Sequence, residues 1–130
     1  MQVTMHEATL PGPSELRSLC PVANALDIVG DRWTLLVIRD LLAGKRRFGD
    51  FLTSPEHIPT NILAERLKRL ERAGLIASVQ YTERPPRFEY QLTASGRDLG
   101  PVVDAMATWG LAQFPGTRRA HRQASAEAPR

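Results

Sequence analysis

The sequence contains very little cysteine, since Cys20 is the only one among its 130 residues. One cysteine excludes a disulfide within the chain and is typical of a reducing compartment, so we expect a cytoplasmic protein. No apolar run reaches the length of a membrane span, because Arg39 and Asp40 interrupt residues 35–42. The N-terminus carries acidic Glu7 and no basic block, which is a poor match to a signal peptide. We therefore expect no membrane association.

Residues that would indicate an enzyme or a metal site are also scarce. His6, His57 and His121 lie far apart in the sequence, and with a single cysteine they form no metal-ligand spacing. A glycine-rich phosphate loop, a nucleophile elbow and a compelling carboxylate pair are all missing. We expect no enzymatic activity, no cofactor and no metal ion. Trp33 and Trp109 could line a pocket for a small ligand, but their helical spacing favours a place in an ordinary core.

Length and charge point to one basic domain. A chain of 130 residues with 42% apolar content suits a single globular domain, and its net charge is +3. Residues 45–87 hold nine basic and five acidic residues, a net charge of +4, whereas residues 1–31 carry −3 and residues 115–130 carry +3. Positive charge concentrated in one stretch suits a polyanionic partner. A merely solvated basic surface is the alternative.

A helix followed by a hairpin is predicted over residues 58–92. Leu63, Leu67 and Leu70 follow the i, i+4, i+7 spacing of one apolar helix face, and Gly74 is suited to the turn that ends the helix. The start of the helix is open, since Pro59 suits a first-turn position and Thr60 suits the cap.

Alternating residues then predict two strands with one buried face. The expected inward side chains are Leu75, Ala77, Val79 and Tyr81 on the first strand and Phe88, Tyr90 and Leu92 on the second. The connection, residues 82–87, contains Pro85 and Pro86, which lack backbone donors and should not extend the strand ladder.

The segments before this unit complete a recognisable order. Residues 1–13 lack periodicity and should form a loose arm. Residues 14–29 favour a helix that breaks or restarts at Cys20-Pro21, and residues 33–42 favour an apolar helix ended by Gly44. Residues 48–52 suit a short helix and 53–58 a turn. A short helix, a turn, a longer helix and a hairpin predict a winged helix-turn-helix, an α+β fold that is mainly helical.

An apolar stripe follows the hairpin. Thr93 is a suitable cap for a helix that Gly100-Pro101 must bend or break. The stripe is longer than one small core needs, which predicts a second copy of the chain as its partner; its members are Leu99, Val102, Met106 and Trp109. We expect a domain over residues 14–114 with dimerisation helices at both ends, and a disordered basic tail over 115–130.

Taken in order, several segments resemble the HxlR-type winged-helix transcriptional regulators of bacteria and archaea. The resemblance covers roughly residues 20–110 and rests on residues 20–22 (CPV), 30–36 (GDRWTLL), 47–51 (RFGDF), 58–67 (IPTNILAERL), 85–90 (PPRFEY) and 92–97 (LTASGR). It implies a homodimeric DNA-binding repressor or activator, with the dimer built from the terminal helices, and we expect a repressor. Pro59 departs from the family, which more often has Ser there.

The resemblance and the predicted helix positions together indicate which residues should contact DNA. On the helix, Thr60, Asn61, Glu65 and Lys68 would face bases, with Arg66 and Arg69 nearer phosphates. Around it, Arg84 and Arg87 would lie at the hairpin tip and Arg46 and Arg47 near the DNA backbone. For Arg66 and Arg69 the alternative is a pairing with a carboxylate of the protein, such as Glu65 or Glu71.

Cys20 is the candidate for a regulatory switch. It precedes a proline-initiated helix, a place that favours the thiolate, and some members of the resembled family use a cysteine here to sense oxidants or electrophiles. The alternative is an inert buried thiol. The expected function is thus binding of a homodimer to an inverted-repeat operator in double-stranded DNA, under control of an oxidant, an electrophile or a small ligand. The competing hypothesis is a winged helix that binds only other proteins.

Overall fold

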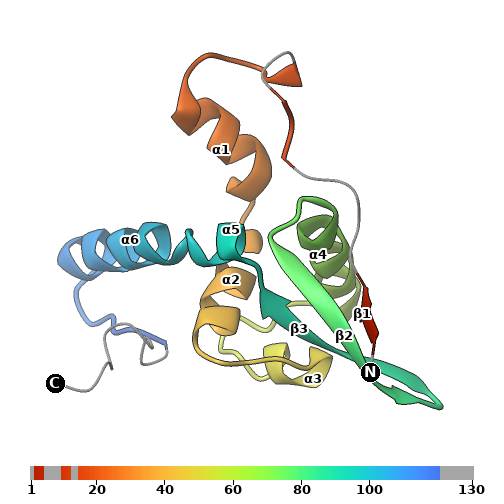
Figure 1. The fold of residues 1–130 in the computed structure, drawn as a ribbon. Helices are drawn as coiled ribbons and strands as arrows, with labels where there is room; N and C mark the ends of the chain where they lie inside the picture. The colour runs from red at the N-terminus through yellow and green to blue at the C-terminus, as the bar shows by residue number, and fades with distance from the viewer. Residues whose placement is uncertain (1, 5–9, 13–14, 121–130) are drawn as a thin grey trace, which may run out of the picture.

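Figure 1 shows the computed structural model, which describes residues 2–4, 10–12 and 15–120. Its helices are α1 (Pro21–Val29), α2 (Thr34–Leu42), α3 (Phe48–Phe51), α4 (Thr60–Arg72), α5 (Ala94–Arg97) and α6 (Gly100–Gln113), and its strands are β1 (Gln2–Thr4), β2 (Ile76–Glu83) and β3 (Pro86–Leu92). Helices α2, α3 and α4 gather around the β2–β3 hairpin, while α1 and α6 extend away from it (Figure 1). The expected α+β, mainly helical winged helix-turn-helix is confirmed.

The core lies where α2, α3 and α4 meet the hairpin. Helix α2 contacts β3 and α4, and α4 contacts β2. The apolar stripe predicted for α4 is fully buried, with Leu63, Leu67 and Leu70 each no more than 2% exposed, and Phe51 of α3 is buried beside it. One face of α4 therefore anchors it in the core and leaves the opposite face in solvent.

The end of α4 fixes the start of the hairpin. Gly74 has a φ of 77°, the left-handed conformation that glycine adopts at no steric cost. Its N–H donates to the carbonyl of Glu71, and the N–H of Leu75 donates to that of Leu70, both at 3.0 Å. This pair of bonds is the Schellman arrangement that closes a helix, so the predicted stop at Gly74 is confirmed.

The inward face expected for the first strand is right only in part, since Leu75 and Ala77 are buried whereas Val79 and Tyr81 are half-buried. Ile76, Ala77 and Ser78 are all buried, and in the antiparallel register Ile76 lies opposite Leu92 and Ser78 opposite Tyr90. The side of β2 that faces the core thus carries Ile76 and Ser78, and on β3 two of the residues predicted to point inward, Tyr90 and Leu92, pack against the core. A register shift between Gln80 and Thr82 follows, and β3 already begins at Pro86. One of the two prolines therefore joins the ladder, opposite Glu83.

A third strand was not expected. Gln2–Thr4 form β1, which pairs antiparallel with the outer edge of β2, Val3 lying opposite Val79. These residues belong to the segment for which a loose arm was predicted, because three residues are too few to show an alternating pattern. Residues 1, 5–9 and 13–14 of that segment lie outside the described part of the chain.

The predicted helix boundaries after the hairpin are confirmed. Thr93 caps α5 by accepting a hydrogen bond from the N–H of Gly96 at 3.1 Å, and Pro101 lies in the first turn of a separate helix, α6. Gly96 is buried, and a Cβ atom on it would lie 2.0 Å from the carbonyl oxygen of Leu75. At the other end, the predicted restart is confirmed, since α1 begins at Pro21 with Cys20 as its N-cap residue. Residues 15–20, which were also expected to be helical, form no α-helix.

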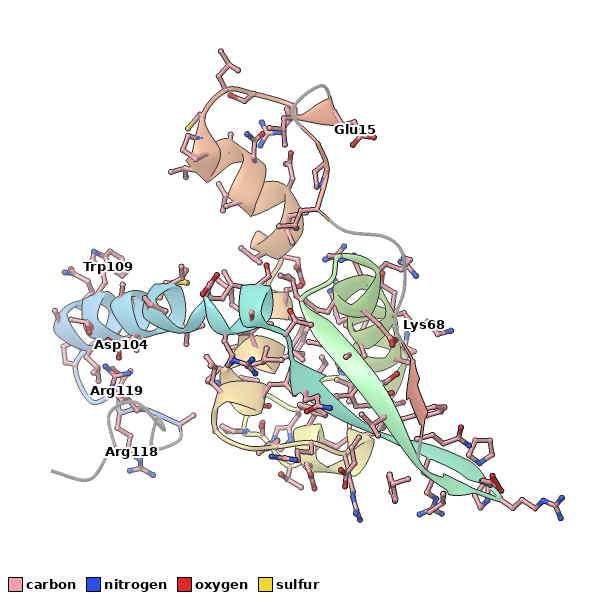
Figure 2. The ribbon with its side chains drawn as sticks, viewed as in Figure 1. Glu15, Lys68, Asp104, Trp109, Arg118 and Arg119 are labelled. Atoms are coloured by element: carbon pink, nitrogen blue, oxygen red, sulfur yellow. The ribbon has the colours of Figure 1, made fainter. Side chains whose placement is uncertain are left out.

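The segment after α6 turns back along that helix. In Figure 2 the side chains of Asp104 and Arg119 face each other below α6, and their Oδ1 and Nη2 atoms are 3.0 Å apart. Phe114 packs edge-on against Trp109 with ring centroids 6.0 Å apart. Residues 115–120 of the expected tail are thus described, and residues 121–130 lie outside the described range. Among the described helices, none has the length and apolarity that crossing a membrane requires.

Candidate nucleic-acid interface

The outer face of α4 is polar and lies in solvent. Asn61, Glu65 and Lys68 are exposed, and they follow the same i, i+4, i+7 spacing as the buried leucines on the other side. Figure 2 shows Lys68 pointing away from the body of the domain. Arg72, which was not among the predicted DNA contacts, continues this exposed stripe in the last turn.

The start of α4 differs from both alternatives that the sequence left open. Pro59 is the N-cap residue and Thr60 is the first residue of the helix, so Pro59 is not in the first turn and Thr60 is not the cap. Proline offers no side-chain acceptor, and the cap makes no side-chain hydrogen bond. The backbone N–H groups at this end of α4 are therefore not capped by a side chain, and exposed Thr60 lies among them.

Arg66 and Arg69 are bound to the protein itself. The Nε of Arg66 lies 2.7 Å from Oδ2 of Asp31, and the Nη2 of Arg69 lies 2.9 Å from Oδ1 of the same carboxylate. Arg66 also contacts Glu65. Both arginines are thus paired with a carboxylate of the protein, as the alternative prediction had it. The carboxylate that they share is that of Asp31, which lies 35 positions from Arg66 in the sequence.

Asp31 gathers further donors at the start of α2. It accepts the N–H groups of Trp33 and Thr34 at 3.0 and 3.1 Å and also contacts the Thr34 hydroxyl. Partial burial would raise the pKa of Asp31, but the hydrogen bonds from Thr34, Arg66 and the Trp33 N–H, together with the charge of Arg66, outweigh it. The pKa of this carboxyl is therefore well below its ordinary value.

The turn into α4 is tied to α2 by a polar cluster. The hydroxyl of Ser54 donates to Oδ2 of buried Asp40 at 2.7 Å, and Nζ of Lys45 donates to the Ser54 oxygen at 2.7 Å. Arg39 binds both oxygens of the Glu56 carboxylate, at 2.9 and 2.8 Å. These contacts fix residues 53–58 and so set the position of the first turn of α4.

The basic corner before α3 lies beside the hairpin. The carbonyl of Arg46 accepts a hydrogen bond from the N–H of Tyr90, and the Nε of Arg47 donates to Glu89 at 2.9 Å. The Arg47 guanidinium also stacks on the ring of Tyr81, 4.1 Å from its centroid. Arg47 stays half exposed, at 54%, and Arg46 is exposed.

The hairpin tip presents two further cations. Arg84 and Arg87 are exposed on either side of the Pro85-Pro86 step, and Thr82 stabilises the turn by donating its hydroxyl hydrogen to the carbonyl of Pro85 at 2.7 Å. The tip projects beyond the helices (Figure 1). Exposed cations at a projecting tip can approach an anionic surface without displacing other parts of the domain.

Apolar side chains are exposed on the two terminal helices. On α1, Leu26 is 55% and Val22 65% exposed, and the preceding Leu19 is 99% exposed. On α6, Met106 and Trp109 are 56% and 63% exposed, and Trp109 points outward in Figure 2. Within the predicted stripe, Val102 is also exposed at 42%, whereas Leu99 packs against the core.

Cys20 lies at the edge of this apolar surface. It is exposed, directly after Leu19, and its N–H donates to the hydroxyl of Ser18 at 3.0 Å. The exposed position excludes the buried-thiol alternative within this chain. At the opposite end of α1, an apolar pocket of about 170 Å³ lies between the helix and the α5–α6 junction; it is lined by Leu10, Ala25, Ile28, Val29, Leu75, Ser95, Asp98 and Leu99.

Trp33, the other tryptophan considered for a ligand pocket, packs against the hydrophobic core, and the cavity that it helps to line measures about 10 Å³. Within the described ranges, no three His, Cys, Asp or Glu side chains group as a metal site. The candidate site is therefore the polar surface formed by the exposed face of α4, the basic corner before α3 and the hairpin tip.

Comparisons with known proteins identify the family. A family model described as HxlR-like helix-turn-helix matches residues 28–117. The HTH-type transcriptional regulator sll1512 of Synechocystis sp. is 41% identical over 106 residues, which cover 82% of this chain and 78% of that protein. The regulator Rv3095 of Mycobacterium tuberculosis is 43% identical over 94 residues, but these cover 72% of this chain and only 59% of that protein.

Solved structures agree with this match. The redox regulator HypR in its oxidized form is 34% identical and superimposes with a TM-score of 0.66, covering 77% of this chain and 99% of that chain. The family match includes α2, α4, the hairpin and α6, which are the elements that build the polar face and its support. The chain therefore belongs to the HxlR-like helix-turn-helix family.

Proposed function

We propose that the protein is a transcriptional regulator, acting as a repressor, that binds an inverted-repeat operator in double-stranded DNA as a homodimer. The observation that carries the proposal is the two-sided character of α4: three buried leucines hold one face in the core, and Asn61, Glu65 and Lys68 line the exposed face. A helix held in this way fits a major groove, where its side chains meet base edges. A DNA-binding role also agrees with the expected cytoplasmic location.

The exposed residues divide into two roles. Thr60, Asn61, Glu65 and Lys68 would read bases, because they occupy the solvent side of α4. Phosphates would be contacted by exposed cations of the basic corner before α3 and of the hairpin tip, which are Arg46, Arg47, Arg84 and Arg87. We leave Arg66 and Arg69 out of the direct contacts, since Asp31 already binds their guanidinium groups.

A homodimer is supported by the apolar faces of α1 and α6. Val22, Leu26, Met106 and Trp109 are each more than half exposed, and an apolar surface of this kind is unusual on a monomer. A symmetric dimer would cover it and would place two α4 helices on one side of the assembly. Two recognition helices related by a two-fold axis read an inverted repeat with half-sites about one helical turn apart, or a multiple of that.

For regulation we propose that Cys20 reacts with oxidants or electrophiles. The thiol is exposed at the start of α1, beside the apolar surface assigned to the dimer, and a structural relative is a redox regulator. Two Cys20 thiols, one from each protomer, would lose two protons and pass two electrons to the oxidant to form one disulfide. A small apolar effector is the second candidate, because the 170 Å³ pocket beside α1 is lined mainly by carbon.

A mobility-shift titration tests the proposal. The duplex should contain the upstream region of the protein's own gene, with a scrambled duplex of equal length as the control. We expect a specific complex at low salt whose affinity falls steeply as salt rises, because bound phosphates release counterions. If the protein forms no specific complex even at low salt, the competing hypothesis of a protein-interaction module is the better one.

A further inference from the structure

Asp31 occupies a position that joins three helices. It follows Gly30, the C-cap residue of α1, and its carboxylate accepts the N–H groups of Trp33 and Thr34 at the start of α2. The same carboxylate binds Arg66 and Arg69 of α4. One acidic side chain thus contacts both of the α4 arginines that were predicted to lie near phosphates.

The two arginines lie next to the exposed stripe of α4. Arg66 directly follows Glu65, and Arg69 directly follows Lys68. The Cα atom of each arginine is therefore one position along the helix from a residue on the solvent face. The side chain of Arg66 is 16% exposed and that of Arg69 is 41% exposed. Without the carboxylate, both side chains are long enough to turn toward a phosphate beside the groove.

Because Asp31 is partly buried, a DNA phosphate cannot easily displace it from Arg66 and Arg69. The Asp31 carboxylate is 22% exposed, and charge-assisted hydrogen bonds in such a place are screened less by water and salt than bonds on an open surface. A phosphate would have to replace Asp31 at both arginines and leave a partly buried carboxylate without its cations. That exchange is unfavourable, because a buried charge that loses its partner pays the full desolvation cost.

We propose that Asp31 is a specificity-determining residue that keeps Arg66 and Arg69 from binding phosphates and so limits non-specific binding to DNA. The inference rests on the proposed DNA-binding function. Phosphate contacts supply most of the affinity for any sequence, whereas base contacts distinguish the operator. Withholding two cations therefore lowers the affinity for random DNA without removing a base contact, and the ratio of specific to non-specific affinity rises.

The test compares the wild type with Asp31→Asn. Asparagine has nearly the same size, and its amide oxygen in the place of Oδ2 can still accept the N–H groups of Trp33 and Thr34, so the start of α2 is retained. The loss of the Oδ1 acceptor releases Arg69, and the loss of the charge weakens the bond to Arg66, which also ends on Oδ2. The dissociation constants for an operator duplex and a scrambled duplex are measured across a salt series. We expect the variant to bind the scrambled duplex more tightly and the slope of log K against log salt to steepen by up to about 1.8, since each neutralised phosphate contributes about 0.9.

Two further variants exclude a general charge effect. Asp27→Asn removes the same charge from α1, where Asp27 pairs with exposed Arg17, and it should leave the salt slope unchanged. Adding Arg66→Gln and Arg69→Gln to Asp31→Asn should abolish the gain on the scrambled duplex. If folded Asp31→Asn has the same slope as the wild type, or if Asp27→Asn steepens it equally, the proposal is overturned.

A readout is also available if Asp31→Asn does not fold. The double variant Arg66→Gln, Arg69→Gln keeps Asp31, and the proposal expects its affinity for the scrambled duplex and its salt slope to match the wild type. A slope shallower by about 1.8 would mean that both arginines already bind phosphates, which overturns the proposal. A wild type that binds neither duplex at low salt would overturn the DNA-binding function itself, and this inference with it.

Discussion

The hydroxyl of Ser78 on β2 donates a 2.7 Å hydrogen bond to the carboxylate of Glu71 on α4, and both side chains are buried. Together with the bond from the Leu75 N–H to the Leu70 carbonyl, it fastens the last turn of α4 to the first residues of the hairpin. Buried polar pairs of this kind hold one relative geometry, because moving either element would leave a polar group unsatisfied. Helix and hairpin should therefore approach DNA as one rigid unit.

Replacing Asn61 by alanine should relax the base preference. Asn61 is exposed in the first turn of α4, and an asparagine that pairs with both edge groups of an adenine contributes roughly 1–3 kcal/mol of discrimination. We expect weaker binding to the preferred operator and little change on a scrambled duplex, measured by competition titration. Gln113→Ala, which truncates an exposed amide on α6, is the matched control. Equal losses on both duplexes would contradict the base-reading role.

Replacing Arg84 by alanine should weaken binding to all sequences alike. The side chain is exposed at the hairpin tip, where it would contact a phosphate rather than a base. We expect the salt slope to become shallower by about 0.9, the contribution of one phosphate. Arg17→Ala removes the same charge near α1 and should leave the slope unchanged. A changed operator preference in Arg84→Ala would instead assign base reading to the hairpin.

Replacing Trp109 by glutamate should weaken dimerisation. Trp109 is 63% exposed on α6, and burying a charge in place of an aromatic side chain should cost roughly 2 kcal/mol or more of association free energy. Sedimentation equilibrium should show a larger monomer fraction, and operator affinity should fall because the half-sites are read jointly. Thr108→Glu places the same charge on the neighbouring exposed residue of α6 as a control. A monomeric Trp109→Glu with full operator affinity would refute the dimer proposal.

Oxidation should act through Cys20. Treatment of the wild type with diamide should weaken operator binding, and a thiol reductant should restore it, because a disulfide between protomers would change the spacing of the two α4 helices. Cys20→Ser has nearly the same size and should not respond. A non-reducing gel separates a disulfide between protomers from other oxidation products. A Cys20→Ser protein that responds like the wild type would leave the pocket beside α1 as the candidate effector site.

The Asp31 carboxylate should make stability depend on acid pH. Because its pKa in the folded protein is below the ordinary value of about 3.9, its stabilising effect is complete above that value and is lost as the pH falls toward the folded pKa. At neutral pH, Asp31→Asn should lower the free energy of unfolding by roughly 1.5–3 kcal/mol, the range for hydrogen bonds to a charged group. Urea titrations at several pH values should show the difference shrinking below pH 4. A difference that is constant with pH would contradict this role.

The sequence was sufficient for the elements whose signals are local. The stripe of Leu63, Leu67 and Leu70 predicted α4, and Gly74 and Pro101 marked a helix end and a helix start, because each signal depends on residues within one or two turns. The family resemblance then ordered these elements into a winged helix. The exposed positions of Asn61 and Lys68 followed from the same periodicity, since they lie opposite the buried face.

Contacts between distant segments were not predictable in this way. The partner of Arg66 is Asp31, and nothing near Arg66 in the sequence distinguishes that carboxylate from adjacent Glu65. The burial of Ser78 on β2 was missed because serine is polar, and its hydrogen bond to Glu71 on α4 explains that burial. Strand β1 depends on pairing with a β2 edge more than 70 positions away, and its three residues carry no pattern of their own.

The close approach of Gly96 to the Leu75 carbonyl connects the base of the hairpin to the segment that leads into α6. Any side chain at this position would push the two backbones apart, since a Cβ atom would lie 2.0 Å from that oxygen. In the proposed dimer, the two α4 helices are held at a distance that depends on how each winged helix is connected to its own α6. The accuracy with which the protein measures operator spacing would then depend on a glycine that touches neither DNA nor the second protomer.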